Sequence, residues 1–152
     1  MNFYKRKFLR MLGLSILSIT FSINALLASS KKVINSNLSD QQKKIMFNEG
    51  TERPYSSELL NEKRNGFYHC ANCGNKLFAS NSKFDSGTGW PSFSEALPGA
   101  FKTKTDYSFG MERVEYHCAN CGAHHGHVFN DGLKESGKRF CNNGLCLIFK
   151  PK

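Results

Sequence analysis

The sequence lacks any long block of like charge. Its 152 residues carry 21 Lys and Arg against 12 Asp and Glu, a formal net charge of +9. Four of the positive charges lie in the first thirty residues, which leaves +5 for the remainder. A moderately basic chain is compatible with nucleic acid or an anionic surface, but here the basic residues are scattered among acids. The remainder also lacks interleaved basic and aromatic segments that stack on bases, so we expect a solvated surface and no nucleic-acid partner.

Acidic residues are absent from residues 1–30, which have the composition of a targeting segment. A basic start at residues 5–10 precedes a mainly apolar run, residues 11–28, and then small residues up to Ser30. This order is typical of a secretory signal peptide, here cleaved after Ser30. An uncleaved membrane anchor is the alternative, because the run is near the lower end of membrane-spanning length.

Polar residues within the run favour the cleavable form: Ser15, Ser18, Thr20, Ser22 and Asn24. No Cys follows the run, so a lipoprotein anchor is not indicated. We therefore expect the folded part to be exported to a bacterial periplasm or secreted. The alternative is attachment to the inner membrane, with membrane contact only if the segment is uncleaved.

The rest of the chain is expected to form a linker, residues 31–38, and one domain, residues 39–152. The linker is polar and shows no period. Ser39 can cap a helix over residues 39–48, with Gln42 three positions on, as in a capping box. A second short helix is predicted over residues 56–64.

From Phe67 onward the pattern predicts a mainly β fold. Thirteen Phe and thirteen Gly indicate a turn-rich core packed with aromatic side chains. Residues 111–118 are the clearest strand, because Val114, Tyr116 and Cys118 alternate with polar residues. Residues 145–149 are predicted to be a short, buried terminal strand.

Four of the six cysteines form two pairs of the same type. In each pair two residues separate the cysteines and a glycine follows: Cys70, Cys73 and Gly74, then Cys118, Cys121 and Gly122. Zinc takes about four such ligands in a tetrahedron. A following glycine lets both thiolates of a pair turn toward one ion, so the spacing predicts one zinc.

Disulfides are the alternative for an even number of cysteines in an exported protein, and a thioredoxin-like redox pair is another. The shared form of the two pairs favours zinc over both. Four thiolates leave no open position for water, so we expect the metal to be structural.

Cys141 and Cys146 remain. Arg139 lies near Cys141 in sequence, and a guanidinium favours the nucleophilic thiolate. Upstream is a cluster of three histidines; on a regular strand His125 and His127 would share one face and His124 would lie on the other. Such a cysteine is often a buried hydrophobe and such histidines a second metal site or polar surface. These residues alone leave a cysteine-based enzyme and a non-enzymatic zinc-ribbon binding module equally open.

Several longer motifs together resemble the type B methionine sulfoxide reductase family. They are GTERPYS at residues 50–56, KFDSGTGWPSF at 83–93, GAHHGHVFNDG at 122–132 and GKRFCNN at 137–143. The resemblance covers about two thirds of the chain and strongly favours the enzyme over the zinc-ribbon module. It implies mostly antiparallel sheets around the active site, with the zinc on the opposite side. It also implies reduction of methionine (R)-sulfoxide, free or in oxidised proteins and peptides.

The resemblance further implies roles for individual residues. Cys141 would attack the sulfoxide sulfur and be left as a sulfenic acid. Protonation of the oxygen must accompany this attack, and His124 and His127 would supply or relay the proton. Asp131 would orient that network, and Arg139 would favour the thiolate.

The resemblance also assigns residues to substrate binding. Trp90 and Phe129 would line the substrate pocket, with Trp90 an aromatic wall for the S-methyl group. Asn143 would hydrogen-bond near the reacting centre. His125 replaces the apolar residue usual at its position; we expect it to face away from the pocket and assign it no role.

The resemblance leaves the regeneration of Cys141 open. Many family members carry a second cysteine at the position of Thr88, which cannot form a disulfide. Cys146 is a substitute only if a turn closes the gap, because five extended residues span about 16 Å and a disulfide needs Cα atoms about 4.4–6.8 Å apart. We therefore expect direct reduction by an external, thioredoxin-like thiol.

Overall fold

The computed structural model describes residues 31–133 and 136–152, so the expected targeting segment, residues 1–30, lies outside it. Within the described ranges no helix is long and apolar enough to cross a membrane. The elements, in chain order, are α1 (Asp40–Asn48), η1 (Glu58–Asn61), β1 (Gly66–Cys70), β2 (Lys76–Ala79), η2 (Ser80–Ser82), β3 (Lys83–Phe84), β4 (Ser92–Phe93), β5 (Phe101–Asp106), η3 (Ser108–Gly110), β6 (Arg113–Cys118), β7 (His124–Phe129), β8 (Arg139–Asn142), η4 (Gly144–Cys146) and β9 (Leu147–Pro151).

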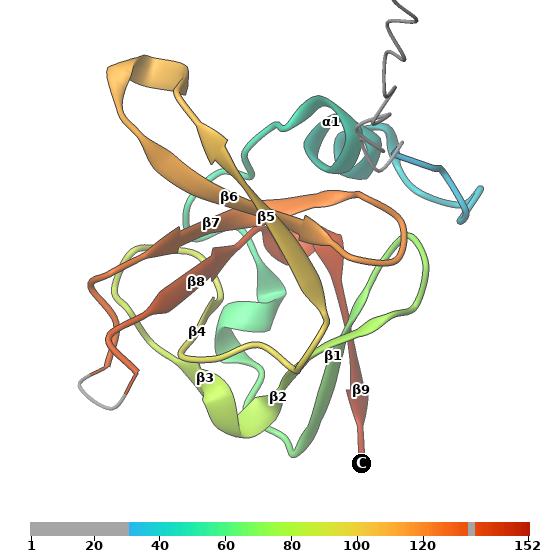
Figure 1. The fold of residues 1–152 in the computed structure, drawn as a ribbon. Coiled ribbons are helices and arrows are strands. Elements are labelled where there is room, and N and C mark those ends of the chain that lie inside the picture. Colours follow the sequence, from blue (N-terminus) through green and yellow to red (C-terminus); the bar gives the residue numbers. More distant parts are fainter. Residues whose placement is uncertain (1–30, 134–135) are drawn as a thin grey trace, which may run out of the picture.

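The first predicted helix is confirmed as α1. Ser39 accepts a hydrogen bond from the amide of Gln42, and the Gln42 side chain accepts one from the amide of Ser39, which forms the capping box. Ile45 and Met46 are buried, and α1 contacts β7 and η4, an arrangement visible in Figure 1.

The second predicted helix is wrong, because the chain forms only the short 3-10 helix η1 there. None of its four residues is buried. Helical turns are costly to start in water and depend on packing of an apolar face; in η1 Leu59 packs against the core but is only partly buried.

The expected linker is held against the first cysteine pair. The side chain of Asn72 accepts hydrogen bonds from the amides of Ile34 and Asn35 and donates one to the carbonyl of Lys32. The amide of Lys32 donates to the carbonyl of Cys121 at 3.1 Å. The segment is therefore bound to the body of the domain.

Two antiparallel sheets form most of the domain, as expected of a mainly β fold (Figure 1). The smaller has the order β2-β1-β9 and the larger β3-β4-β8-β7-β6-β5. All recorded strand pairs are antiparallel. The larger sheet places β7 between β6 and β8, so residues from three strands meet on one surface.

Both predicted strands are present, but their burial differs from the prediction. The first is β6, but Val114 is 43% exposed whereas Glu115 is 1% exposed, opposite to the predicted alternation. Burial of Glu115 is offset because its carboxylate forms an ion pair with Lys104 and a hydrogen bond with His124. The terminal strand is β9, which begins at Leu147 and runs along one edge of the smaller sheet, with Leu147 its only buried residue.

Aromatic rings fill the space between the sheets, as the composition predicted. Phe78 of the smaller sheet stacks on Phe93 of the larger one, with ring centroids 4.0 Å apart. Tyr68 contacts Phe93 edge-on at 4.9 Å, and Tyr116 is completely buried. Offset and edge-on aromatic contacts add to the free energy of burial, so this core fixes the position of β8 and β7.

Candidate active site and metal centre

The two cysteine pairs sit at the ends of strands from different sheets. Cys70 ends β1 and Cys118 ends β6. After each, the chain turns back so that the amide of the following glycine donates to the cysteine carbonyl at 2.8 Å. Gly74 and Gly122 have φ of 74° and 71°, a left-handed conformation that glycine adopts without strain. The predicted function of these glycines is confirmed.

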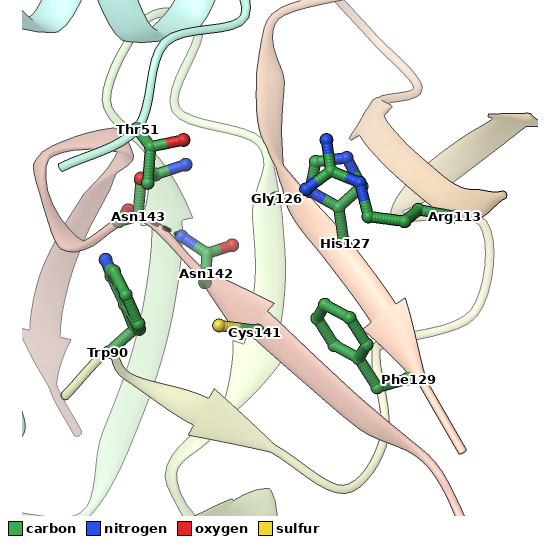
Figure 2. Close-up of a pocket in the computed structure, with 9 residues that line it drawn as sticks. All are labelled: Thr51, Trp90, Arg113, Gly126, His127, Phe129, Cys141, Asn142 and Asn143. Carbon is green, nitrogen blue, oxygen red and sulfur yellow. Dashed lines mark hydrogen bonds between the residues drawn. The ribbon is translucent and has the colours of Figure 1, made fainter. Parts of the chain in front are cut away.

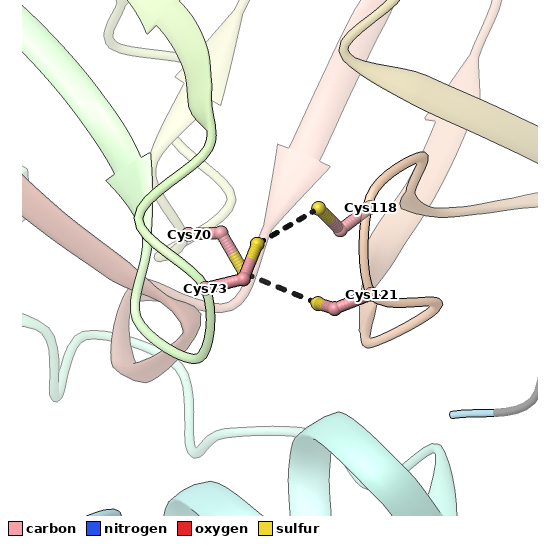
Figure 3. A group of neighbouring side chains, drawn as sticks. All are labelled: Cys70, Cys73, Cys118 and Cys121. Atoms are coloured by element: carbon pink, nitrogen blue, oxygen red, sulfur yellow. Dashed lines mark hydrogen bonds between the residues drawn. The ribbon is translucent and has the colours of Figure 1, made fainter. Parts of the chain in front are cut away.

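The four sulfurs of these pairs converge on one point (Figure 3). All lie within 4.8 Å of one another, with Cys70 to Cys121 at 3.8 Å and Cys73 to Cys118 at 3.6 Å. A tetrahedral zinc with bonds of about 2.3 Å requires sulfurs roughly 3.8 Å apart. A disulfide needs about 2.05 Å, and all six cysteines are free thiols, so the disulfide alternative is wrong. The donor set fits one structural zinc.

An irregularity in β7 sets the direction of its histidines. Tyr116 of β6 pairs with Gly126, but the next residue, His117, pairs with His124. His125 is therefore an extra residue, a β-bulge, and a bulge changes which face the following side chains point to.

The bulge overturns the expected alternation of the histidines. The rings of His124 and His127 come together, with centroids 5.6 Å apart, whereas a regular strand would separate them. His125 points away from the pocket described below and is completely buried. Burial lowers the pKa of His125 to about 4.

Cys141 opens into a pocket formed mainly by β7 and β8 (Figure 2). Its cavity measures about 130 Å³, roughly tenfold more than one water molecule needs. The lining residues are Thr51, Trp90, Arg113, Gly126, His127, Phe129, Cys141, Asn142 and Asn143. Figure 2 shows Cys141 between the rings of Trp90 and Phe129. His127 is the residue of β7 directly opposite Cys141 in the sheet register.

Burial and charge act in opposite directions on the Cys141 thiol. Burial raises its pKa, and this effect outweighs the Arg139 guanidinium and a hydrogen bond with Thr88, which lower it. Arg139 thus lowers the pKa of Cys141, as predicted, but the pKa of the free thiol stays above its ordinary value.

Asp131 does not hold the histidines, and that expectation is wrong. Its carboxylate accepts two hydrogen bonds from Arg139, at 2.9 and 2.8 Å. The Arg139 guanidinium also lies over the Phe129 ring, 4.5 Å from its centroid. Asp131 therefore orients the guanidinium beside Cys141. Bidentate pairs of this kind are the more rigid form of ion pair.

The histidines have other carboxylate partners, which the sequence analysis missed. His127 Nε2 lies 2.8 Å from Asp106 Oδ2, and Arg113 binds the same oxygen at 2.7 Å. His124 Nδ1 lies 2.8 Å from Glu115 Oε1. No local motif marks either acid, because each meets its histidine only through the pairing of β5, β6 and β7.

Only one of the two predicted catalytic histidines lines the Cys141 pocket. His127 does so, and burial lowers its pKa while the hydrogen bond with Asp106 opposes that shift. His124 instead lines a neighbouring depression that shares Thr51, Arg113 and His127 with the pocket. Its ring lies next to that of His127, with centroids 5.6 Å apart.

Asn143 and Trp90 are both held by the backbone of Glu52. The Asn143 side chain accepts a hydrogen bond from the Glu52 amide at 2.8 Å and donates to the carbonyl of His125 at 3.0 Å. Trp90 Nε1 donates to the Glu52 carbonyl at 2.9 Å. The Asn143 amide thus shapes the pocket wall through backbone contacts.

Known proteins match this chain over most of its length. A family model described as the SelR domain matches residues 38–151. The peptide methionine sulfoxide reductase MsrB of Variovorax paradoxus (strain S110) is 55% identical over 103 residues, covering 67% of this chain and 76% of that protein. MsrB of Leifsonia xyli subsp. xyli (strain CTCB07) is 45% identical over 128 residues, covering 83% and 92%.

Among solved structures, the Mis18 "Yippee-like" domain aligns with a TM-score of 0.49 at 15% identity, covering 59% of this chain and 98% of that one. That likeness is too distant to bear on function. The named reductases, by contrast, favour the enzyme over a non-enzymatic zinc-ribbon module.

We predict that the purified protein contains about one zinc per chain and that Cys118→Ser loses both the zinc and the fold. Structural zinc contributes about 10–16 kcal/mol in small domains, comparable to the whole stability of a domain. Elemental analysis and thermal unfolding measure the two effects. Cys146→Ala is the matched control, because this buried cysteine lies outside the cluster; zinc loss there as well would contradict the assignment of ligands.

We predict that Arg139→Gln moves the pH dependence of Cys141 alkylation to higher pH. The guanidinium lowers the pKa of this thiol, so its removal raises that pKa and reduces the thiolate fraction at any given pH below it. The rate of iodoacetamide labelling, located by mass spectrometry, reports the change. Lys138→Gln, which removes the neighbouring exposed charge, should leave the profile in place; an equal shift in both variants would contradict a specific effect.

Proposed function

Because the chain belongs to the SelR-domain family of peptide-methionine (R)-S-oxide reductases, we propose that Cys141 is the thiol that attacks the sulfoxide sulfur. The enzyme is an oxidoreductase that reduces methionine (R)-sulfoxide in proteins or peptides to methionine. One observation carries the assignment of Cys141. Of the six cysteines, four form the zinc cluster and Cys146 is completely buried, whereas Cys141 lines an open pocket.

The proposed reaction transfers the sulfoxide oxygen to the enzyme. The Cys141 thiolate attacks the electrophilic sulfur and forms an S–S bond while the oxygen is protonated. The hydroxyl group then passes from the substrate sulfur to the Cys141 sulfur: the S–O bond of the substrate and the new S–S bond break, and an S–O bond to Cys141 forms. Methionine leaves with its sulfur reduced by two electrons, and Cys141 keeps the oxygen as a sulfenic acid, oxidised by two electrons. Because the pKa of the free thiol is raised, we expect the thiolate to form chiefly when substrate displaces water and a proton moves to the oxygen.

His127 is placed to supply that proton. It lies opposite Cys141 across the β7–β8 pairing and lines the same pocket. Asp106 holds Nε2 of its ring, which leaves Nδ1 to serve the substrate, and the carboxylate stabilises the charged imidazolium. His124, with its own carboxylate partner Glu115, is placed to relay a proton to His127.

The aromatic walls explain the choice of substrate. A methyl sulfoxide presents an apolar methyl group and a polar oxygen at one sulfur. Trp90 and Phe129 offer the apolar surface on the two sides of Cys141, and sulfur–aromatic contacts are favourable. Figure 2 shows His127 on the β7 side of Cys141, above Phe129. This asymmetry supports binding of one epimer with its oxygen toward His127.

Regeneration of Cys141 is proposed to depend on an external, thioredoxin-like thiol. Cys146 is completely buried in η4, and burial raises its pKa well above the ordinary value, so it is poorly suited to attack a sulfenic acid. Thr88, at the position where many relatives are expected to carry a second cysteine, has no thiol and cannot form a disulfide.

The compartment of this reaction is proposed to lie outside the cytoplasm. The composition of residues 1–30 supports export to a periplasm or secretion, with a membrane anchor as the alternative. Repair of oxidised methionine in other exported proteins would then be the physiological task.

We predict that the enzyme reduces only the R epimer of an acetylated methionine sulfoxide and that Cys141→Ser abolishes turnover. A hydroxyl at this position is too weak a nucleophile to attack the sulfur. Chromatography of both epimers with dithiothreitol as reductant measures the activity. Cys146→Ala should retain activity within about twofold; full turnover by Cys141→Ser would overturn the mechanism.

We predict that one equivalent of substrate, without reductant, leaves Cys141 as a sulfenic acid that dimedone labels. Mass spectrometry should then find no disulfide between Cys141 and Cys146, because Cys146 is buried. Thr88→Cys is the matched variant, because many relatives are expected to carry the second cysteine at this position; it should form a disulfide with Cys141 instead of accepting dimedone. A quantitative Cys141–Cys146 bond in the native protein would contradict direct reduction.

A further inference from the structure

Of the three histidines of β7, His125 is the one that the reaction above does not use, and it lies between the metal centre and the pocket. Its side chain is completely buried. Nε2 lies 3.4 Å from the sulfur of Cys70, and the ring packs edge-on against Phe101 with centroids 5.4 Å apart. Burying an imidazole in place of an apolar side chain costs free energy unless its polar atoms form hydrogen bonds. The contact between Nε2 and the Cys70 sulfur is therefore the interaction that could offset this cost.

The chemistry of a metal-bound cysteine fixes the direction of this hydrogen bond. A cysteine that ligates zinc is a thiolate, which has lone pairs and no proton to give. The hydrogen must therefore lie on His125 Nε2. Asn75 Nδ2 makes a similar but longer contact, 3.8 Å, with the sulfur of Cys118. Donors of this kind stabilise the ligands and tune the metal.

The backbone of His125 contacts the other site. The carbonyl of His125, the extra residue of the bulge, accepts two hydrogen bonds from Asn143. These come from the Asn143 amide at 2.9 Å and from its side chain at 3.0 Å. Asn143 lines the Cys141 pocket. One residue thus contacts the metal cluster through its ring and the pocket through its carbonyl.

We infer that His125 is a positioning residue that anchors the β7 bulge to the zinc cluster and thereby holds the active site in register. The bulge brings His124 and His127 to the same side and directs the carbonyl that fixes Asn143. The hydrogen bond from Nε2 to the Cys70 thiolate prevents the extra residue from slipping out of the strand. Loss of zinc would then disturb the pocket even though the metal takes no part in the reaction.

The catalytic part of this inference rests on the proposed roles of His127 and Cys141, whereas the metal part does not. The test therefore begins with readouts that require no turnover. His125→Leu removes the donor but restores an apolar side chain. His125→Gln is the matched control, because its side-chain amide can place an N–H near the position of Nε2.

Two measurements follow the metal. In cobalt-substituted His125→Leu the thiolate-to-cobalt charge-transfer bands should shift to longer wavelength, because a thiolate without its donor holds its electrons less tightly. Transfer of zinc from the native metal form to an excess of chelator should be about tenfold faster than in the unsubstituted protein. His125→Gln should retain the native bands and release zinc within about twofold of the native rate.

A third measurement follows the pocket. With zinc bound, His125→Leu should lose kcat by about tenfold with little change in KM, since His125 does not touch substrate. His125→Gln should restore kcat. Unchanged cobalt bands and zinc release in a folded His125→Leu would overturn the inference whatever its activity. Equal losses in both variants would overturn it too, because packing and not the hydrogen bond would then be responsible. If the reductase assignment alone is wrong, the cobalt bands and the zinc release of His125→Leu should still change as predicted, because neither measurement depends on turnover.

Discussion

Four sulfurs can satisfy one tetrahedral metal only if the ends of β1 and β6 are held a few ångströms apart, and most of this structure follows from that requirement. The two strands belong to different sheets, and between their cysteines the chain runs through four more strands, β2 of the smaller sheet and β3, β4 and β5 of the larger one. The metal centre therefore closes a large loop and sets how the sheets face each other. The stacked rings of Phe78 and Phe93 then fill the space that results.

The bulge in β7 is the second constraint on the structure. One extra residue in a strand reverses the side on which every later side chain emerges. Here it converts two histidines an odd number of positions apart into neighbours, and it leaves His125 directed at the metal ligands. A single irregularity thus supplies both the paired rings beside the pocket and the contact that links the pocket to the cluster.

The pocket itself shows two opposing effects on reactivity. Burial protects Cys141 from water and raises the pKa of its thiol, while Arg139, held by Asp131, favours the thiolate. A thiol that is only partly activated at rest is less exposed to oxidation, and in the proposed reaction it would gain nucleophilicity as the substrate oxygen is protonated. In the same way, the hydrogen bond with Asp106 opposes the effect of burial on the His127 pKa, and Glu115 holds the His124 ring by a hydrogen bond.

Local patterns in the sequence were sufficient for the features that depend on neighbouring residues. The capping box at Ser39, the two cysteine pairs with their glycines, and the mainly β character follow from spacings of two to four residues, whose geometry is set by local backbone sterics. The longer motifs around Cys141 were sufficient for the family. Tertiary structure alone decided the rest: the side of the sheet on which His124 emerges, the acids that hold the histidines, the burial of Glu115, and the contact of His125 with Cys70. Each depends on how strands distant in sequence pair, and a one-residue change in that register reverses every face, which no single stretch of sequence records.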